Sequence, residues 1–158
     1  MNMKIRWKPF LISLGIPLAI GGLSAFLTND SMKEFQQLNQ PPLSPPGWLF
    51  PVVWSILFVL MGIASYLVCT SDVPRRDRRT ALWLYGVQLG VNFFWSIFFF
   101  NLGLYLFSFL WLLFLWVLLL ALWLLFRRIS KPAGWLLVPY LLWVTFAGYL
   151  NLGIYFLN

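Results

Sequence analysis

Five long apolar runs, separated by short polar stretches, dominate the sequence. The runs cover residues 9–27, 46–70, 80–100, 104–126 and 134–157. Each run has 19 residues or more, which is long enough for a helix to cross a bilayer core of roughly 30 Å. The pattern therefore predicts an all-α membrane protein, a bundle of five transmembrane helices that forms a single domain over the whole chain, residues 1–158.

Residues 28–45 form the only polar stretch of any length, and we predict that they are a loop outside the membrane. Within this loop, Ser31 and Glu34 have the spacing of a capping box, which predicts a short surface helix. The stretch ends in paired prolines, which suit the first turn of the second helix because a missing N–H costs nothing there. Pro51 lies further along the run, where we expect it to leave a carbonyl free and allow a kink. The stretch from Gln40 to Trp54 is either the wall of a pocket or a rigid loop with an interfacial tryptophan anchor.

The basic residues predict the orientation of the bundle. The N-terminal tail, the second loop and the fourth loop hold ten of the eleven Lys and Arg residues, and the first loop holds only Lys33. Cytoplasmic loops carry such an excess of positive charge. We therefore predict that the N-terminus is inside and the C-terminus outside a cell membrane, a bacterial plasma membrane by expectation.

Composition supports lipid as the main solvent of this surface. The chain is 61% hydrophobic and only 9% charged, whereas a soluble domain is about 25% charged. The basic clusters alternate with apolar runs, which is typical of membrane topology and not of a nucleic-acid surface. The lipid bilayer is thus an expected partner and nucleic acid is not.

Several kinds of chemistry are disfavoured by what the sequence lacks. It has no histidine and a single cysteine, Cys69, so the commonest metal ligand and general base are missing and no intrachain disulfide can form. No Asp, Glu, Lys or Arg falls within the five runs, which argues against an ion pump or a carboxylate proton relay. We expect no metal site and no required cofactor.

The third run carries a polar face. Its residues at helical spacing are Gln88, Asn92, Trp95, Ser96 and Phe99. Amides are costly in hydrocarbon unless they have partners, so we predict that this face looks into the bundle. The amides would then either join neighbouring helices or face a ligand in an aromatic cavity.

A second feature of the third run is a GxxxG pair, Gly86 and Gly90. The pair lies almost opposite Asn92 on the helix, and small residues let another helix approach closely. A homodimer through this face is our hypothesis, although the motif is weak in apolar sequence.

Three ordered motifs carry a family pattern. They are Pro45-Pro46 followed by Trp54; Gln88 and then Asn92-Phe-Phe-Trp95-Ser96 with Phe98-Phe99; and Pro139-Tyr140-Leu-Leu-Trp143-Val-Thr-Phe146-Ala147 with Leu150-Asn151. Together with five spans, a long first loop and 158 residues, they resemble the translocator protein family. This family is also called TspO/MBR, tryptophan-rich sensory protein or peripheral benzodiazepine receptor.

The resemblance implies a five-helix, often dimeric bundle that binds porphyrins and, in some members, sterols or isoquinoline and benzodiazepine drugs. By motif position it implies a ligand site formed by Pro45, Pro46, Trp54, Phe58, Asn92, Trp95, Ser96, Trp143, Ala147 and Leu150. It also makes Trp54 and Trp143 the candidate catalytic residues for the porphyrin photodegradation reported for some bacterial members.

The chain departs from the family pattern in the first loop. A common Trp-Tyr pair is replaced by Glu34-Phe35, and Lys-Pro-x-Trp is replaced by Gln40-Pro41-Pro42-Leu43. No basic residue follows Tyr149 or Tyr155, so the proposed sterol motif of animal members is not supported. The wall of the implied pocket is therefore better supported than its lid.

Three functions remain open at this point. The first is a membrane protein that binds tetrapyrroles as sensor, carrier or scavenger, because an aromatic cavity suits a flat macrocycle. The second is an enzyme that degrades porphyrin with light and oxygen through tryptophan. The third is a structural or partner-binding membrane protein that uses the glycine pair.

Overall fold

The computed structural model describes residues 5–158, and in these residues it contains helices and no strand. The helices are α1 (Trp7–Phe35), α2 (Leu49–Cys69), α3 (Arg75–Ser96), α4 (Tyr105–Ile129) and α5 (Lys131–Leu157), with a π-helical segment at Ile97–Asn101 that extends α3. All five are long and apolar enough to cross a membrane. The predicted all-α, five-span membrane fold is confirmed.

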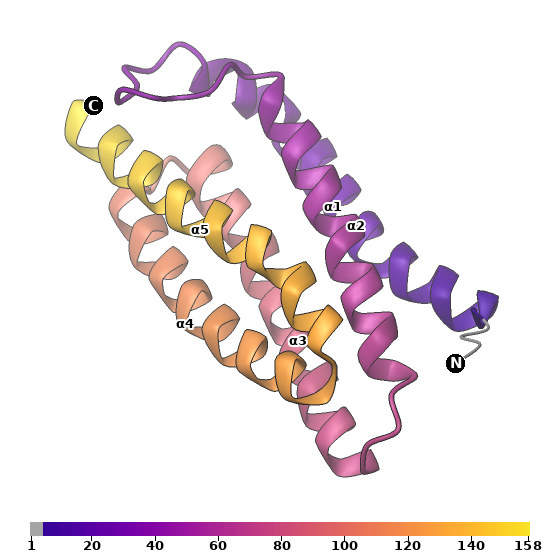
Figure 1. The fold of residues 1–158 in the computed structure, drawn as a ribbon. Helices are drawn as coiled ribbons and strands as arrows, with labels where there is room; N and C mark the ends of the chain where they lie inside the picture. Colours follow the sequence, from indigo (N-terminus) through magenta and orange to yellow (C-terminus); the bar gives the residue numbers. More distant parts are fainter. Residues whose placement is uncertain (1–4) are drawn as a thin grey trace.

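Successive helices run in opposite directions along the bundle (Figure 1). α4 packs most extensively against α5, α1 packs mainly against α2, and α2 also packs against α5 (Figure 1). The first loop, residues 36–48, lies at the same end as the C-terminus, where Tyr149 Oη donates to the carbonyl oxygen of Pro42 over 2.7 Å. We call this the loop end.

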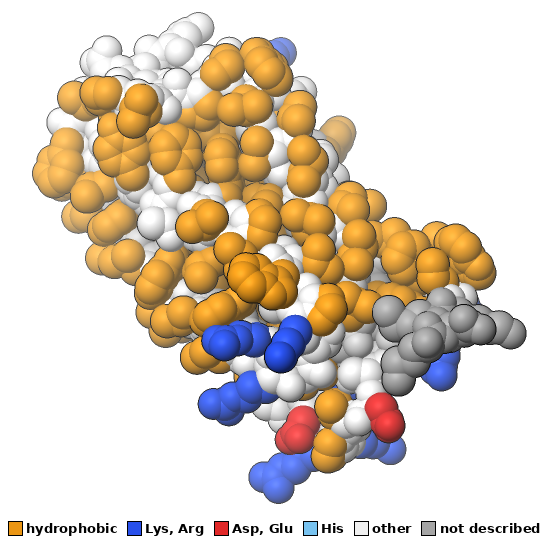
Figure 2. Space-filling view, in the orientation of Figure 1, with side chains coloured by type: hydrophobic (Ala, Val, Ile, Leu, Met, Phe, Trp, Pro, Cys, Tyr) orange, Lys and Arg blue, Asp and Glu red, His pale blue; other side chains and the backbone are white. Residues whose placement is uncertain are grey.

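The opposite end carries the positive charge, and we call it the basic end. Its basic residues are Arg6 and Lys8 at the start of α1, Arg75, Arg76, Arg78 and Arg79 around the start of α3, and Arg127, Arg128 and Lys131 around the α4–α5 turn. Figure 2 shows most of the visible Lys and Arg side chains at this end, and hydrophobic side chains over most of the remaining visible face. An apolar belt of this kind is what a bilayer requires.

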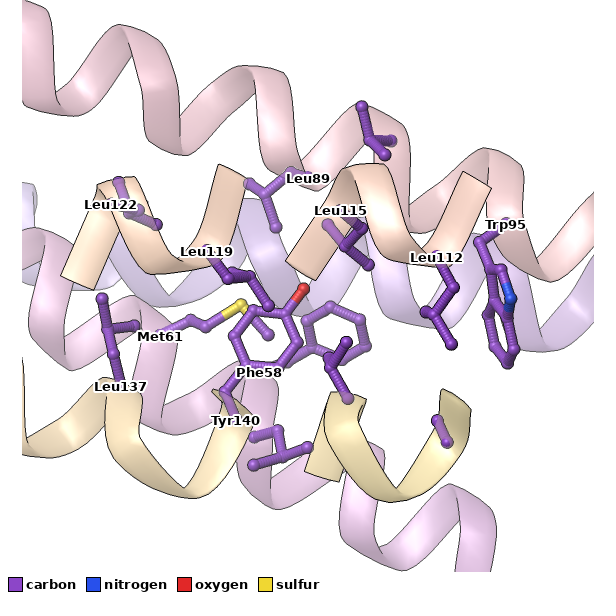
Figure 3. Packing of buried hydrophobic residues seen from close by; sticks show 14 of the residues in the cluster. Phe58, Met61, Leu89, Trp95, Leu112, Leu115, Leu119, Leu122, Leu137 and Tyr140 are labelled. Atoms are coloured by element: carbon purple, nitrogen blue, oxygen red, sulfur yellow. The ribbon is translucent and has the colours of Figure 1, made fainter. Parts of the chain in front are cut away.

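The core of the bundle follows from a leucine stripe on α4. Leu112, Leu115, Leu119 and Leu122 are buried at alternating three- and four-residue spacing, the pattern that packs one helix against others. They meet Met61, Leu137 and Tyr140 in the interior, from α2 and α5 (Figure 3). The tightly packed part of the molecule is thus built from α2, α3, α4 and α5.

Two predictions about the first loop are wrong. α1 continues without a break to Phe35, so there is no separate surface helix that begins with a capping box at Ser31. Ser31 lies inside α1, and its Oγ donates over 2.7 Å to Asn101 Oδ1 in the π-helical segment, so it does not cap a helix. The loop accordingly begins at residue 36 and not at residue 28.

The entry into α2 also differs from the prediction. The helix begins at Leu49, and Pro45 and Pro46 lie in the turn before it, where the backbone N–H of Leu49 donates to the Pro46 carbonyl oxygen over 3.0 Å. Pro51 is therefore in the first helical turn, where an N–H has no helical partner in any case. Pro51 therefore leaves no carbonyl inside the helix without a partner, which removes the reason for the predicted kink.

Candidate functional site

A cavity of about 370 Å³ lies between α1, α2 and α3 near the loop end. Its α1 side is made of small residues, Gly21, Ser24, Ala25 and Thr28. These residues recur at spacings of three and four, so they share one helical face. Because their side chains are short, they leave space open between α1 and the side chains of α2 and α3.

The opposite wall of the cavity is aromatic. It consists of Phe50, Trp54 and Phe58 from α2 and Phe100 from the π-helical segment. Trp54 is the central ring: its centroid lies 5.7 Å from that of Phe58. Rings in this arrangement offer flat faces and edges against which a planar ligand can stack.

Polar side chains line the rest of the cavity. They are Asn29, Lys33, Gln36, Asn92 and Ser96. Lys33 is the only basic residue of the loop end, and it contributes a positive charge at the cavity wall. Asn92 is only 3% exposed, so a polar group is available deep in an otherwise apolar space.

Asn92 belongs to a buried hydrogen-bond network between α3 and α5. Asn92 Nδ2 donates to the hydroxyl oxygen of Tyr140, which donates over 2.8 Å to Gln88 Oε1. Within residues 5–158, no donor is bonded to Asn92 Oδ1. The two predicted roles of the amide face are therefore divided: Gln88 joins helices, while Asn92 joins helices through its nitrogen and lines the cavity.

A second, much smaller void of about 20 Å³ lies on the α5 side of Trp54. It is lined by Trp95, Trp143, Ala147 and Leu150, among other residues. Trp143 Nε1 is buried and has no hydrogen-bond partner within the described residues. A buried N–H without a partner is costly, so an acceptor beside Trp143 would be favourable.

Three aromatic residues separate the cavity from the void, because Phe50, Trp54 and Phe100 line both. We call them the aromatic partition. Phe35, the last residue of α1, packs its ring against Phe50 at 5.9 Å and against Phe100 at 5.3 Å. The partition is thus held in place from the loop end.

The ten residues of the predicted ligand site fall into three groups. Trp54, Phe58, Asn92 and Ser96 line the cavity. Trp95, Trp143, Ala147 and Leu150 line the small void, which Trp54 shares. Pro45 and Pro46 line neither of these, but a separate hollow under the first loop that also contacts Phe35.

The two candidate catalytic tryptophans, Trp54 of the aromatic partition and Trp143 of α5, pack directly against each other. The rings of Trp54 and Trp143 are edge to face with centroids 6.4 Å apart. Trp95, which flanks them, has its indole Nε1 bonded to Asn151 Oδ1 over 3.1 Å. The structure therefore brings the predicted residues of α2, α3 and α5 into one aromatic cluster.

The predicted dimer face is open. Nothing lies within 4 Å of a Cβ added at Gly86 or at Gly90, so neither glycine is used for packing within the chain. The homodimer stays a prediction.

Sequence reasoning missed the contribution of α1. The sequence pattern assigns no site residue to the first run, and it places Thr28, Asn29 and Lys33 in the loop. The i, i+3, i+4, i+7 spacing of Gly21, Ser24, Ala25 and Thr28 was the available signal. In the structure the same helix face runs past the apolar run and forms the cavity wall.

Together, the fold and the cavity define a multi-pass helical membrane protein with an aromatic pocket near one surface. The family model described as the TspO/MBR family matches residues 13–157, and the chain belongs to this family. The resemblance read from the three motifs is confirmed.

Relatives from bacteria and animals match nearly the whole chain. A tryptophan-rich protein TspO from Chlorobaculum tepidum is 38% identical over 158 residues, which is 100% of this chain and 99% of the relative. A tryptophan-rich sensory protein from Cereibacter sphaeroides is 32% identical over 94% of this chain and 90% of its own. A translocator protein from Ovis aries is 31% identical over 94% of this chain and 89% of its own.

Proposed function

We propose that this protein binds a flat tetrapyrrole, of the porphyrin or haem type, in the cavity between α1, α2 and α3. It would act as a sensor, carrier or scavenger of such ligands. The observation that carries the proposal is the cavity of about 370 Å³, in which an aromatic wall faces a small-residue wall and Asn92 presents an unpartnered oxygen. Ligand pockets commonly have about 300–1,000 Å³ and this mixture of apolar walls with a few polar groups.

The relatives support a role in ligand sensing or transfer through their names, which are tryptophan-rich sensory protein and translocator protein. A planar macrocycle would stack on Trp54 and Phe58, and its polar substituents would meet Lys33 or Gln36 at the loop end. A ligand wider than the cavity would have to displace Phe50, which lies between the cavity and the small void. This displacement would join the two spaces and give the ligand access to Trp143. Isoquinoline and benzodiazepine drugs, which are smaller flat ligands, are included in the proposal.

The test is a titration of the purified protein with protoporphyrin, followed by the quenching of tryptophan fluorescence. We expect saturable binding that weakens about tenfold, or 1.4 kcal/mol, in Trp54→Ala and in Asn92→Ala. Trp83→Ala is the matched control, because Trp83 is 70% exposed and lines no part of the cavity. Absence of saturable binding, or equal loss in the control, would contradict the proposal.

A second candidate is degradation of the bound porphyrin with light and dioxygen. The observation that favours it is the contact between Trp54 and Trp143, whose ring centroids lie 6.4 Å apart. Illumination of the protoporphyrin complex should then give products, and Trp143→Phe should stop their formation while binding is kept. Unchanged product formation in Trp143→Phe would remove the assignment to this residue.

A further inference from the structure

A second large hollow lies at the basic end, and it is formed by residues of α4 and α5 and not by α1 or α2. It has about 430 Å³ and is lined by Trp123 and Arg127 of α4 and by Lys131, Gly134, Trp135 and Val138 of α5. None of these residues lines the cavity of the proposed function. The hollow is therefore a separate feature that the binding of a tetrapyrrole does not explain.

The hollow brings two positive side chains together without an acidic neighbour in their hairpin. Arg127 is in the last turns of α4 and Lys131 is the first residue of α5. No Asp or Glu occurs anywhere after Asp77. The guanidinium of Arg127 lies over the ring of Trp123, 5.3 Å from its centroid, an arrangement that holds an arginine side chain in place while its donors stay available.

The backbone of the α4–α5 turn sets the spacing of these two cations. A Cβ at Gly134 would lie 2.8 Å from Arg127 Cβ and 3.0 Å from Arg127 Cα. Only glycine therefore lets α5 start this close to the end of α4, with Arg127 and Lys131 beside the same hollow. Ser130 already caps α5, since its Oγ accepts from the backbone N–H of Ala133. An anion in the hollow would thus be bound chiefly by the two side chains.

The remaining wall is apolar and faces outward. Trp135 is 74% exposed. Val138 lies about one helical turn further along α5, away from the basic end. Figure 2 shows that the Lys and Arg residues of this end border the hydrophobic surface directly. Tryptophan prefers the boundary between acyl chains and headgroups, so the hollow has cations at headgroup level and an apolar side toward the acyl chains.

We propose that this hollow binds the phosphate of an anionic phospholipid. The phosphate oxygens accept charge-assisted hydrogen bonds from Arg127 and Lys131, and the acyl chain lies against Trp135 and Val138. Basic pockets between transmembrane helices at a membrane surface are suited to such headgroups. A lipid fits this hollow better than free phosphate, because the hollow continues into the exposed apolar surface at Trp135 and Val138. Inorganic phosphate would leave this apolar part empty.

The experiment is native mass spectrometry of the full-length protein with phosphatidylglycerol and, separately, phosphatidylcholine. We expect the protein to retain phosphatidylglycerol preferentially. The double variant Arg127→Gln/Lys131→Gln should retain it about tenfold less than the control double variant Arg75→Gln/Arg79→Gln. The control removes the same charge from the same end, but neither of its residues lines the hollow.

Two further variants keep the test independent of folding and of general charge. Arg127→Lys retains the positive charge and should keep most of the preference for phosphatidylglycerol over phosphatidylcholine. Trp135→Ala removes apolar contact and should lower the fraction of protein that carries either lipid. Saturable binding of protoporphyrin by each variant shows that it is folded, or, if the proposed function fails, a helical circular dichroism spectrum does. Equal retention by the two double variants, equal retention of the two lipids, or displacement of phosphatidylglycerol by inorganic phosphate would each overturn the proposal.

Discussion

α4 and α1 each present to the bundle a helix face with three- and four-residue spacing, but the space in front of the α4 face is filled and the space in front of the α1 face is a cavity. We call α2, α3, α4 and α5 around the α4 face the filled half, and the cavity with α1 the hollow half. On α4 the face consists of Leu112, Leu115, Leu119 and Leu122, all of which are buried. On α1 it consists of Gly21, Ser24, Ala25 and Thr28, which line the cavity. The period is the same, so the difference comes from the size of the side chains: large ones fill the space between helices and small ones leave it open.

Burial of whole helices shows the same contrast. α1 buries three of its 29 residues, whereas α2, its neighbour, buries nine of 21. α1 thus packs against α2 but buries few of its own residues, and Asn101 Nδ2 joins it to the π-helical segment by donating to the carbonyl oxygen of Leu27 over 3.1 Å. Elements that bury few residues open most easily. We therefore expect ligand exchange on the α1 side of the bundle and expect the stability to reside in α2, α3, α4 and α5.

The largest effect that tests this division is a cavity made in the filled half. Leu115→Ala should lower the free energy of unfolding by about 2–5 kcal/mol, because Leu115 is fully buried and its neighbours relax only in part. Leu113→Ala on the same helix is the control, since Leu113 is 46% exposed. The measurement is unfolding of the detergent-solubilised protein by heat or by sodium dodecyl sulfate.

The same pair of variants also tests the separation of stability from binding. Folded Leu115→Ala should bind protoporphyrin within about threefold of the unsubstituted protein, which is less than 0.7 kcal/mol. A large loss of affinity with little loss of stability would show that the two halves are not divided as we describe.

The next effect concerns the hydrogen-bond network between α3 and α5, which reaches the cavity at Asn92. Gln88→Leu leaves the Tyr140 hydroxyl without its acceptor, and we expect a loss of about 1–2 kcal/mol in stability. Protoporphyrin affinity should change little, because Gln88 is fully buried and does not line the cavity. Asn92→Leu is the comparison, since Asn92 does line it.

A double substitution sharpens this result. Tyr140→Phe combined with Gln88→Leu removes the donor together with its acceptor, so the combined loss should be smaller than the sum of the two single losses. Additive losses in thermal unfolding would mean that the two side chains do not share a hydrogen bond, and the structural role assigned to Gln88 would fail.

How far the sequence predicts this structure differs between the two halves. The five spans and the inward polar face of α3 could be predicted, because hydropathy and helical period decide them. The end of α1 could not: Thr28, Asn29 and Lys33 have the composition of a loop, but they continue a helix that leaves the apolar run. Polar residues on a helix and in a loop look alike in sequence when the helix extends beyond the membrane.

The division of the candidate site could not be predicted either. Helical spacing puts Trp54 and Asn92 on inward faces, but it does not fix which way an indole turns or which ring fills the space beside it. In the structure, Phe50 and Trp54 separate Asn92 from Trp143 and Ala147, so one implied pocket becomes a cavity and a small void. Side-chain packing from Phe35, which the sequence places in the loop, contributes to this outcome.

The smallest effect we predict comes from adding a single methyl group to the α1 wall of the cavity. A Cβ at Gly21 would lie 2.6 Å from the ring of Phe58, whereas nothing lies within 4 Å of a Cβ at the neighbouring Gly22. Gly21→Ala must therefore move the Phe58 ring into the cavity or push α1 outward, and we expect protoporphyrin affinity to fall about three- to tenfold, or 0.7–1.4 kcal/mol. Gly22→Ala makes the same change in helix propensity without this contact, so its affinity should stay unchanged. Equal affinities of the two variants in the fluorescence titration would mean that the ligand does not occupy the space between α1 and Phe58. The ligand site would then have to lie on the α5 side of Trp54 and not in the cavity.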